Sequence, residues 1–267
     1  MCKVKYFLFL WHLWVSIPVS AQILNVDKNK LNPQEDSAGY FVADFHASVR
    51  AYNRSAGVDD PVNLFGYNFG GDAGYIGKSY SLMIINKYDY LQINDGIFLN
   101  AGYSHFRSIF KRKNRLSYEG FAQYQYDNFR GLHPRLLGGG GLRLSVIERK
   151  KFALRLGIGA MYEYEEWEQP YHDERVFMNL VKSTNYAIVR WELNEHVKIN
   201  TICYFQTGYD TQIDAFRNRV SGEFNLNVNL TERLRYTGSF SANYEDKPIV
   251  PITGFIYSLT NGLSFSL

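Results

Sequence analysis

The fold is decided by the stretch Phe152-Ala153-Leu154-Arg155-Leu156-Gly157-Ile158-Gly159-Ala160-Met161-Tyr162-Glu163-Tyr164. Its large apolar residues recur at every second position, while Arg155 and Glu163 occupy positions between them. Successive side chains of an extended chain point to opposite sides, so the stretch has one apolar face and one face that carries charges. Such a strand suits a wall with lipid on one side and water on the other.

The stretch from Val220 to Thr231 alternates as cleanly. Its apolar positions are Val220, Phe224, Leu226, Val228 and Leu230, and its polar positions are Ser221, Glu223, Asn225, Asn227 and Asn229. A face with three asparagines is poorly suited to the dry core of a soluble sheet. The pattern therefore favours a membrane-spanning strand whose polar face lines a wet interior.

Twelve segments alternate in this way, and a transmembrane strand needs only about 9–11 residues. They lie near residues 40–53, 62–76, 79–92, 96–110, 116–128, 135–147, 152–166, 182–194, 197–208, 217–230, 234–245 and 256–267. The third and ninth alternate least well, and the contiguous apolar residues from Leu82 to Ile85 indicate a bulge or another register in the third. We therefore predict an all-β fold, a transmembrane antiparallel up-and-down β-barrel of about twelve strands over residues 40–267.

The connections between the segments alternate in length. The second, fourth, sixth, eighth and tenth are short and polar, at residues 77–78, 111–115, 148–151, 194–196 and 231–233. The others are longer, at residues 54–61, 127–134, 168–181, 208–216 and 246–255, except for a tight hairpin at Asn94-Asp95-Gly96. Short periplasmic turns and longer outer loops are typical of outer-membrane barrels. None of the loops is long enough for a large plug.

The N-terminus has the pattern of a secretory signal. Lys3 and Lys5 precede an apolar run over residues 6–19, and Val19-Ser20-Ala21 predicts cleavage before Gln22. A transmembrane anchor is the weaker alternative, because about fourteen apolar residues fall short of the roughly twenty that a spanning helix needs. We expect a signal peptide at residues 1–21 and a short periplasmic arm at residues 22–39. Export through the periplasm predicts a location in a Gram-negative outer membrane.

Charge and cysteine content exclude several alternatives. The formal charge of +3 falls to +1 when Lys3 and Lys5 leave with the signal, so nothing indicates a nucleic-acid partner. Of the two cysteines only Cys203 remains in the mature chain, which rules out an internal disulfide.

The ends of the segments are rich in aromatic residues. Tyr40, Phe41, Tyr88, Tyr90, Tyr124, Tyr126, Tyr162, Tyr164, Tyr244 and Tyr257 lie there. This placement predicts girdles at the two membrane surfaces, and the ordinary sheet propensity of Tyr and Phe is the weaker alternative. The last segment alternates to the end of the chain, with Phe265 two residues before Leu267. We expect it to be recognised by the barrel-assembly machinery.

One region resembles a known family. Tyr118-Glu119-Gly120-Phe121-Ala122-Gln123-Tyr124-Gln125-Tyr126-Asp127-Asn128-Phe129-Arg130-Gly131-Leu132 runs into Pro134-Arg135-Leu136-Leu137-Gly138-Gly139-Gly140-Gly141-Leu142, and Leu156-Gly157-Ile158-Gly159-Ala160-Met161-Tyr162-Glu163-Tyr164-Glu165-Glu166 follows. Residues 116–167 are similar to the core of the YdiY-like family, which is named for salt-induced outer-membrane proteins. The resemblance implies an outer-membrane barrel of unassigned activity.

Two clusters contain residue types that occur in ligand-binding sites. Gly138 to Gly141 has no Gly-Lys-Ser/Thr after it, so we interpret it as a place where the strand curves or a large interior side chain needs room. His172-Asp173-Glu174, with Glu165, Glu166 and Glu168 nearby, is better explained as a solvated acidic loop than as a metal site. We expect neither a metal nor a cofactor.

An outer-membrane lipid hydrolase is the main enzymatic alternative. It would need a nucleophile beside an oriented histidine. His46 and His105 are the histidines on predicted strands, and neither Ser48 nor Ser104 lies in a recognisable nucleophile motif. We therefore expect no enzyme activity.

The candidate functional residues are polar positions expected to face the interior. They are Ser117, Glu119, Gln123, Gln125, Arg143, Arg155, Glu163, Asn225, Asn227 and Arg235. Two functions stay open at this point. The interior is either a narrow channel for small solutes or ions, or a salt-bridge network in a structural or envelope-stress barrel without transport. We expect a monomer surrounded by outer-membrane lipids.

Overall fold

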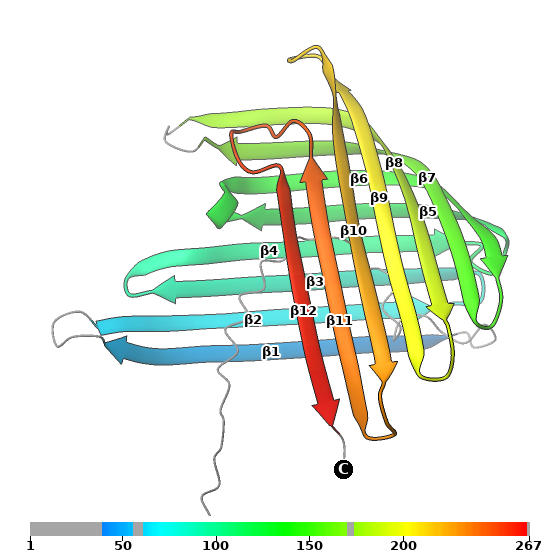
Figure 1. The fold of residues 1–267 in the computed structure, drawn as a ribbon. Coiled ribbons are helices and arrows are strands. Elements are labelled where there is room, and N and C mark those ends of the chain that lie inside the picture. Colours follow the sequence, from blue (N-terminus) through cyan, green and yellow to red (C-terminus); the bar gives the residue numbers. More distant parts are fainter. Residues whose placement is uncertain (1–38, 56–60, 170–173, 266–267) are drawn as a thin grey trace, which may run out of the picture.

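The structure is a computed structural model that describes residues 39–55, 61–169 and 174–265. It contains twelve strands: β1 (Tyr40–Ser55), β2 (Pro61–Ile76), β3 (Tyr80–Ile93), β4 (Gly96–Phe110), β5 (Leu116–Asp127), β6 (Leu132–Glu148), β7 (Phe152–Glu168), β8 (Arg175–Glu192), β9 (Val197–Asp210), β10 (Ala215–Asn229), β11 (Leu234–Glu245) and β12 (Phe255–Phe265). A 3-10 helix, η1 (Asn128–Arg130), precedes β6. Each strand pairs antiparallel with the next in a single sheet, so the predicted all-β, up-and-down arrangement of twelve strands is confirmed (Figure 1).

The predicted strand positions hold with one larger correction. Residues 168–181 were predicted as the longest loop, but β8 begins at Arg175, and the connection spans residues 169–174. Val176, Met178 and Leu180 face inward there, while Phe177 and Val181 face outward. Because both faces of this segment are apolar, the alternation that marks the other strands disappears from the sequence.

The contiguous apolar residues of β3 are also explained by a strand that is apolar on both faces. Pairing with β4 is regular from Tyr80 to Leu91, and the register shifts only between Leu91 and Gln92. Met83 and Ile85 point inward and are buried, whereas Ile84 points outward and is exposed. The run from Leu82 to Ile85 is therefore neither a bulge nor a slipped register, but a strand with an apolar residue on each face.

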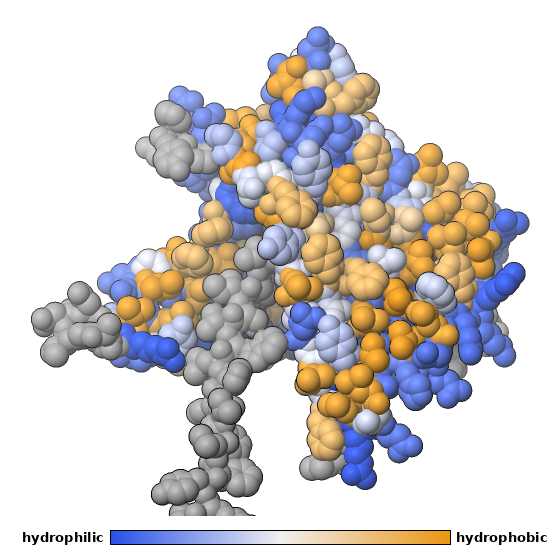
Figure 2. Space-filling model, viewed as in Figure 1, coloured by the Kyte–Doolittle hydropathy of each residue, from blue (hydrophilic) through white to orange (hydrophobic). Residues whose placement is uncertain are grey.

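The two faces of the sheet have opposite chemistry. On the outward face Leu156, Ile158 and Tyr162 are 42%, 63% and 54% exposed. Figure 2 shows apolar side chains spread over the outer surface of the curled sheet. On the opposite face of the same strand, Glu163 is completely buried. The distribution is the reverse of that in a soluble sheet protein, where charges are exposed and large apolar side chains are covered.

The sheet is strongly curled. In Figure 1, β9–β12 pass in front of β1–β4 and cross them steeply. Gly141 of β6 pairs directly with Gly159 of β7. A Cβ atom on Gly141 would lie 2.5 Å from the Ile158 carbonyl oxygen, and one on Gly159 would lie 2.5 Å from that of Gly140. These glycines let the two backbones approach, as expected for a curved wall.

The first and last strands are the edges of the sheet. Hydrogen-bonded pairing runs from β1 to β12 in chain order, and within the described residues no ladder joins β12 back to β1. The predicted signal peptide and nearly all of the predicted arm lie outside the described residues. In the part of the chain that is described, no helix has the length and apolar character needed to cross a membrane.

Candidate functional site

The sheet has two ends, which differ in the connections that lie there. We call the end with the connections 77–79, 111–115, 149–151, 193–196 and 230–233 the turn end. The opposite end, with the connections 94–95, 128–131, 169–174, 211–214 and 246–254, is the loop end.

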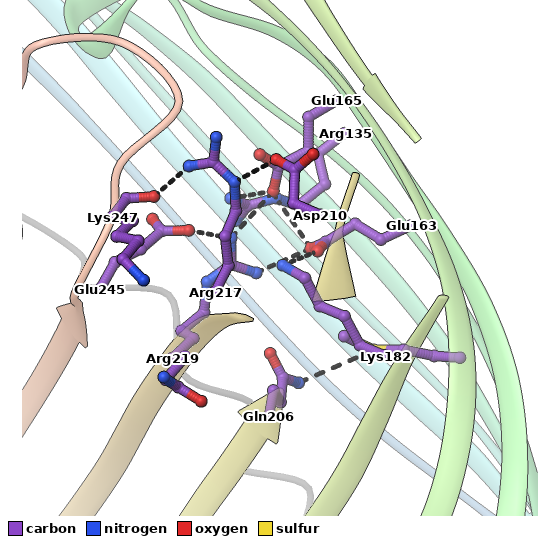
Figure 3. Close-up of polar contacts among 12 residues, drawn as sticks. Arg135, Glu163, Glu165, Lys182, Gln206, Asp210, Arg217, Arg219, Glu245 and Lys247 are labelled. Carbon is purple, nitrogen blue, oxygen red and sulfur yellow. Dashed lines mark hydrogen bonds and ion pairs between the residues drawn. The ribbon is translucent and has the colours of Figure 1, made fainter. Parts of the chain in front are cut away.

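Six charged side chains are buried together near the loop end. This loop-end ion cluster consists of Arg135 on β6, Glu163 and Glu165 on β7, Lys182 on β8, Arg219 on β10 and Glu245 on β11. Figure 3 shows these side chains converging from the curved wall. Three carboxylates face three cations, so the cluster is neutral as a whole.

Glu163 has the largest number of cationic partners in the cluster. Arg219 Nη1 lies 2.7 Å from Glu163 Oε1, and Arg135 Nε lies 3.4 Å from the same oxygen. The Lys182 ammonium pairs with Glu163 Oε2. The three cations come from β6, β8 and β10, so one carboxylate ties together strands on both sides of its own.

Glu165 and Glu245 complete the cluster. Glu165 Oε1 accepts from Arg135 Nε at 2.5 Å and from Arg219 Nη2 at 3.0 Å, and Glu165 Oε2 accepts from the Trp167 indole at 2.8 Å. Glu245 Oε1 accepts from Arg219 Nη2 at 2.9 Å. Arg219 thus bridges three carboxylates. The planar guanidinium suits this role in a buried site because its several N–H donors have fixed directions.

A second ion pair connects this region to a loop. Arg217 Nε lies 2.6 Å from Asp210 Oδ2, and another guanidinium nitrogen of Arg217 donates to the backbone carbonyl of Lys247. The Lys247 ammonium donates in turn to the Phe216 carbonyl oxygen at 3.0 Å. These contacts fix the start of the connection 246–254 to β10.

The connection 246–254 folds over the interior and reaches the opposite wall. Val250 is 3% exposed and packs in one apolar cluster with Leu132 at the start of β6 and Trp167 near the end of β7. Ile249 and Ile252 pack against the same cluster. This nine-residue segment, which we call the loop strap, was not anticipated from the sequence, where no connection was long enough to suggest a large plug.

Asp246 anchors the strap at its beginning. Burial would raise the pKa of its carboxyl, but hydrogen bonds outweigh it, and the pKa is lowered from its ordinary value of 3.8. The donors are the backbone N–H and the side-chain amide of Asn218, each at 2.8 Å. The ionised form is therefore the one that holds the strap.

A smaller polar group lies near the turn end. The Arg107 guanidinium pairs with Glu119, and both contact the Tyr186 hydroxyl, which lies 2.9 Å from Arg107 Nη2 and 2.8 Å from Glu119 Oε2. Tyr186 belongs to β8 and reaches β5 because Gly157 of β7 leaves room for its ring. A Cβ on Gly157 would lie 2.1 Å from that ring.

Between the two groups the interior holds a cavity of about 90 Å³. Its lining includes His105, Gln123, Gln125, Thr184, Tyr204 and Gln206, together with Arg107 and Glu119 on one side and Arg219 on the other. The cavity is large enough for several water molecules, since one needs about 10–15 Å³.

The predicted interior residues have different environments. Ser117, Glu119, Gln125 and Glu163 are buried, Gln123, Arg143, Arg155, Asn225 and Asn227 are partly buried, and Arg235 is exposed. Glu119, Gln123 and Gln125 come together at the cavity, and Glu163 joins the loop-end ion cluster. Arg155 instead pairs with Glu148 near the turn end, at 2.7 Å. Arg235 donates to Asn229 Oδ1.

The sequence reasoning missed five of the six members of the loop-end ion cluster. Arg135 and Lys182 began their predicted segments, and Arg219 and Glu245 lay close to segment ends, where the parity of a strand is hardest to read. Glu165 was assigned to a solvated acidic loop, which is wrong, because it is completely buried on β7. The usable signal was its spacing of two from Glu163, which extends the same face.

The rest of that acidic loop is only partly described. His172 and Asp173 lie outside the described residues. Among the residues that the structure describes, no three histidine, cysteine or acidic side chains are grouped as metal ligands.

A family model described as "Protein of unknown function, DUF481" matches residues 67–249, about two thirds of the chain. The chain belongs to the DUF481 family. DUF481 is the YdiY-like family that residues 116–167 resemble, so the assignment made from those motifs is confirmed. No curated protein matches the chain. The DUF481 match includes all six residues of the loop-end ion cluster and the Arg107–Glu119 pair, so the polar interior lies within the family region.

Proposed function

We propose that this DUF481 protein is an outer-membrane β-barrel that forms a narrow conduit for small solutes or ions and is closed at rest. The observation that carries the proposal is the reversed sheet, with apolar side chains exposed on one face and charged side chains buried on the other. A wall of this kind is stable when hydrocarbon covers its outer face.

The dimensions of the strands support a membrane location. They contain 11 to 18 residues, which exceeds the roughly 9–11 needed to span a bilayer. Exposed aromatic pairs lie at both ends: Tyr75–Tyr80 at the turn end, and Phe98–Phe129 and Tyr209–Phe216 at the loop end. Two aromatic belts are expected where a barrel meets the two lipid headgroup layers.

Closure of the barrel is part of the proposal. Twelve strands in up-and-down order leave β1 and β12 antiparallel, and unpaired backbone groups at two sheet edges are costly in hydrocarbon. We therefore expect β12 to pair with β1 in the membrane. We also expect the assembly machinery to recognise β12, and the barrel to remain a monomer among outer-membrane lipids.

Cysteine cross-linking tests closure. Ser48→Cys on the inward face of β1 is combined in turn with Ser258→Cys, Thr260→Cys or Gly262→Cys on β12, in a Cys203→Ser background. One of these pairs should form a disulfide in lipid vesicles, while a cysteine at Phe45, on the outward face of β1, should not cross-link to any of them. If no pair cross-links, the membrane form is not closed through β1 and β12.

The conduit would be opened by moving the loop strap. The strap, the loop-end ion cluster and the Arg107–Glu119 pair lie one after another along the interior, with the cavity between the two charged groups. Ion pairs can exchange partners without leaving a charge uncompensated, so a polar interior can rearrange where a packed apolar core cannot.

Single-channel recording in planar bilayers tests conduction. Wild type should show rare, small openings, and replacing residues 247–253 by a Gly-Ser linker should raise the open fraction. The control replaces residues 211–214 at the same end. Glu119→Lys should shift selectivity towards anions by placing a second cation beside Arg107. A folded barrel that stays silent in all four forms is not a conduit.

A structural barrel without transport is the second candidate. It is favoured by the loop-end ion cluster, in which each of the six charges is paired with an opposite charge. This function predicts permanent silence in the conductance experiment and loss of envelope integrity when the protein is removed.

We propose no hydrolase activity. Among the described residues, the side chain that interacts with the His105 ring is the amide of Gln123, and no nucleophile is hydrogen-bonded to it. Ser104, its neighbour in β4, points to the other face of the sheet. Lipid hydrolysis that is lost in His46→Ala or His105→Ala would contradict this.

A further inference from the structure

The cavity lies between the two charged groups, and part of its lining consists of neutral hydrogen-bonding side chains. Gln123, Gln125 and Gln206 contribute amides, and Thr184 and Tyr204 contribute hydroxyls. Each of these groups can both donate and accept hydrogen bonds. The lining therefore matches a ligand with several hydroxyl or amide groups.

His105 gives an independent indication of a ligand. Its side chain lines the cavity and is only 2% exposed, and within the part of the chain that is described neither ring nitrogen makes a hydrogen bond of good geometry; the polar side chain that interacts with the ring is that of Gln123. The ring is held between the rings of Tyr103 and Phe121, each with its centroid 6.3 Å away. A buried polar group with incomplete hydrogen bonding is destabilising, and a ligand in the cavity would complete the hydrogen bonding of the ring.

The charges around the cavity limit the charge of that ligand. Six charged residues line the cavity, and each has a counter-charge: Arg107 faces Glu119, Arg130 lies near Asp127, and Arg135 and Arg219 both contact Glu163 and Glu165. A charged ligand would lose its hydration without gaining an unpaired counter-charge. A neutral ligand has a smaller desolvation penalty and can hydrogen-bond to the amides and hydroxyls of the lining.

We propose that the cavity is a binding site for a small uncharged polyhydroxy solute, with His105 as the residue that recognises it. The proposal rests on the proposed function, because the cavity lies on the path of the conduit. Phe121 and Tyr186 supply aromatic walls for the C–H faces of such a solute. The volume of about 90 Å³ restricts the class to small molecules.

Saturation-transfer NMR on the folded full chain in detergent micelles tests the site, with glycerol as the probe and acetate and methylammonium as charged probes of similar size. Glycerol should show saturable transfer, and the two ions should show little. Ser221→Phe, which fills the cavity from β10, should abolish the glycerol signal. Ser239→Phe, on the inward face of the neighbouring strand β11 but away from the cavity, should leave it unchanged.

His105→Phe separates recognition from packing. It keeps an aromatic ring between Tyr103 and Phe121 but removes the ring nitrogens, so glycerol should bind about fivefold more weakly, as expected for one lost hydrogen bond. Resistance to urea should be nearly unchanged, because the ring nitrogens make no hydrogen bond of good geometry within the described residues. A residue with only a packing role would leave glycerol affinity unaltered.

Equal glycerol transfer to wild type and Ser221→Phe overturns the proposal, as does acetate or methylammonium binding as strongly as glycerol. Silence from all three probes means that the cavity holds water alone, which also overturns it. The two proposals fail separately. If the barrel conducts but does not bind glycerol, the conduit is supported and the binding site is not. If it binds glycerol but never conducts, the binding site is supported and the conduit is not.

Discussion

The loop-end half of the interior buries six charges in a single network, whereas the turn-end half combines the buried Arg107–Glu119 ion pair with an apolar cluster. That cluster consists of Met83, Ile85, Tyr103 and Ile109, from β3 and β4. In the loop-end half, Arg219 alone touches three carboxylates. The two halves share the same curled sheet and the same apolar outer face.

The difference shows two ways of filling the inside of a reversed sheet. Buried charges must be neutralised together, so each member of the loop-end ion cluster depends on the others. Apolar packing is divided among many small contacts, so a single substitution costs less. We expect the loop-end half to tolerate substitution poorly and the turn-end half to tolerate it better.

Glu163→Gln should have the largest effect. It leaves Arg135, Lys182 and Arg219 facing only two carboxylates inside the wall, and breaking a buried ion pair costs about 3–5 kcal/mol. The measurement is the free energy of unfolding by urea from lipid vesicles. Glu166→Gln is the control, because Glu166 pairs with the exposed Arg175 and should cost less than about 1 kcal/mol. If both variants lose a similar amount of unfolding free energy, the network is not cooperative.

Glu119→Gln at the turn end should cost less. Only Arg107 loses its counter-charge, and the Tyr186 hydroxyl and the new amide oxygen can still accept from it. Breaking a buried ion pair costs about 3–5 kcal/mol, and the loss of unfolding free energy should lie at the low end of that range because two hydrogen-bond acceptors remain for Arg107. The same urea experiment measures it. If Glu119→Gln loses more unfolding free energy than Glu163→Gln, the turn-end half is the one that tolerates substitution poorly.

Ile85→Val tests the apolar cluster. Removing one buried methylene should cost about 0.5–1.5 kcal/mol, because the residue is 3% exposed and packs against its neighbours on the inward face. Ile84→Val, next to it on the outward face, should have almost no effect in lipid, where acyl chains fill the space. Equal losses would show that the inward face of β3 is no better packed than the outward face.

Acidification should have the smallest effect, and it should be confined to the loop strap. The folded-state pKa of Asp246 is lowered below 3.8 by its hydrogen bonds from Asn218, so its contribution is complete above the unfolded pKa and is lost as pH falls through the folded pKa. Protease cleavage within residues 247–253 should therefore increase below about pH 4. Asp246→Asn should be cleaved equally at pH 5 and pH 3. Cleavage of wild type that does not change over this range would show that Asp246 does not anchor the strap.

Much of the fold could be predicted, because alternation is a local property. The face of each strand follows from residues two apart, and Leu156, Ile158 and Glu163 lie on the predicted faces. The prediction was incomplete where both faces are apolar, as in β3 and at the start of β8. It was also incomplete at segment ends, which is where most members of the loop-end ion cluster lie.

The sequence by itself determined that this chain forms a sheet of twelve antiparallel strands with one apolar and one polar face, since period two needs no knowledge of distant residues. Only the tertiary structure decided which polar residues meet. Glu163 and Arg219 are 56 residues apart, and Val250 reaches Leu132 across the interior. These contacts depend on how tightly the sheet curls, and curvature accumulates over many strands from backbone approaches such as that of Gly141 and Gly159.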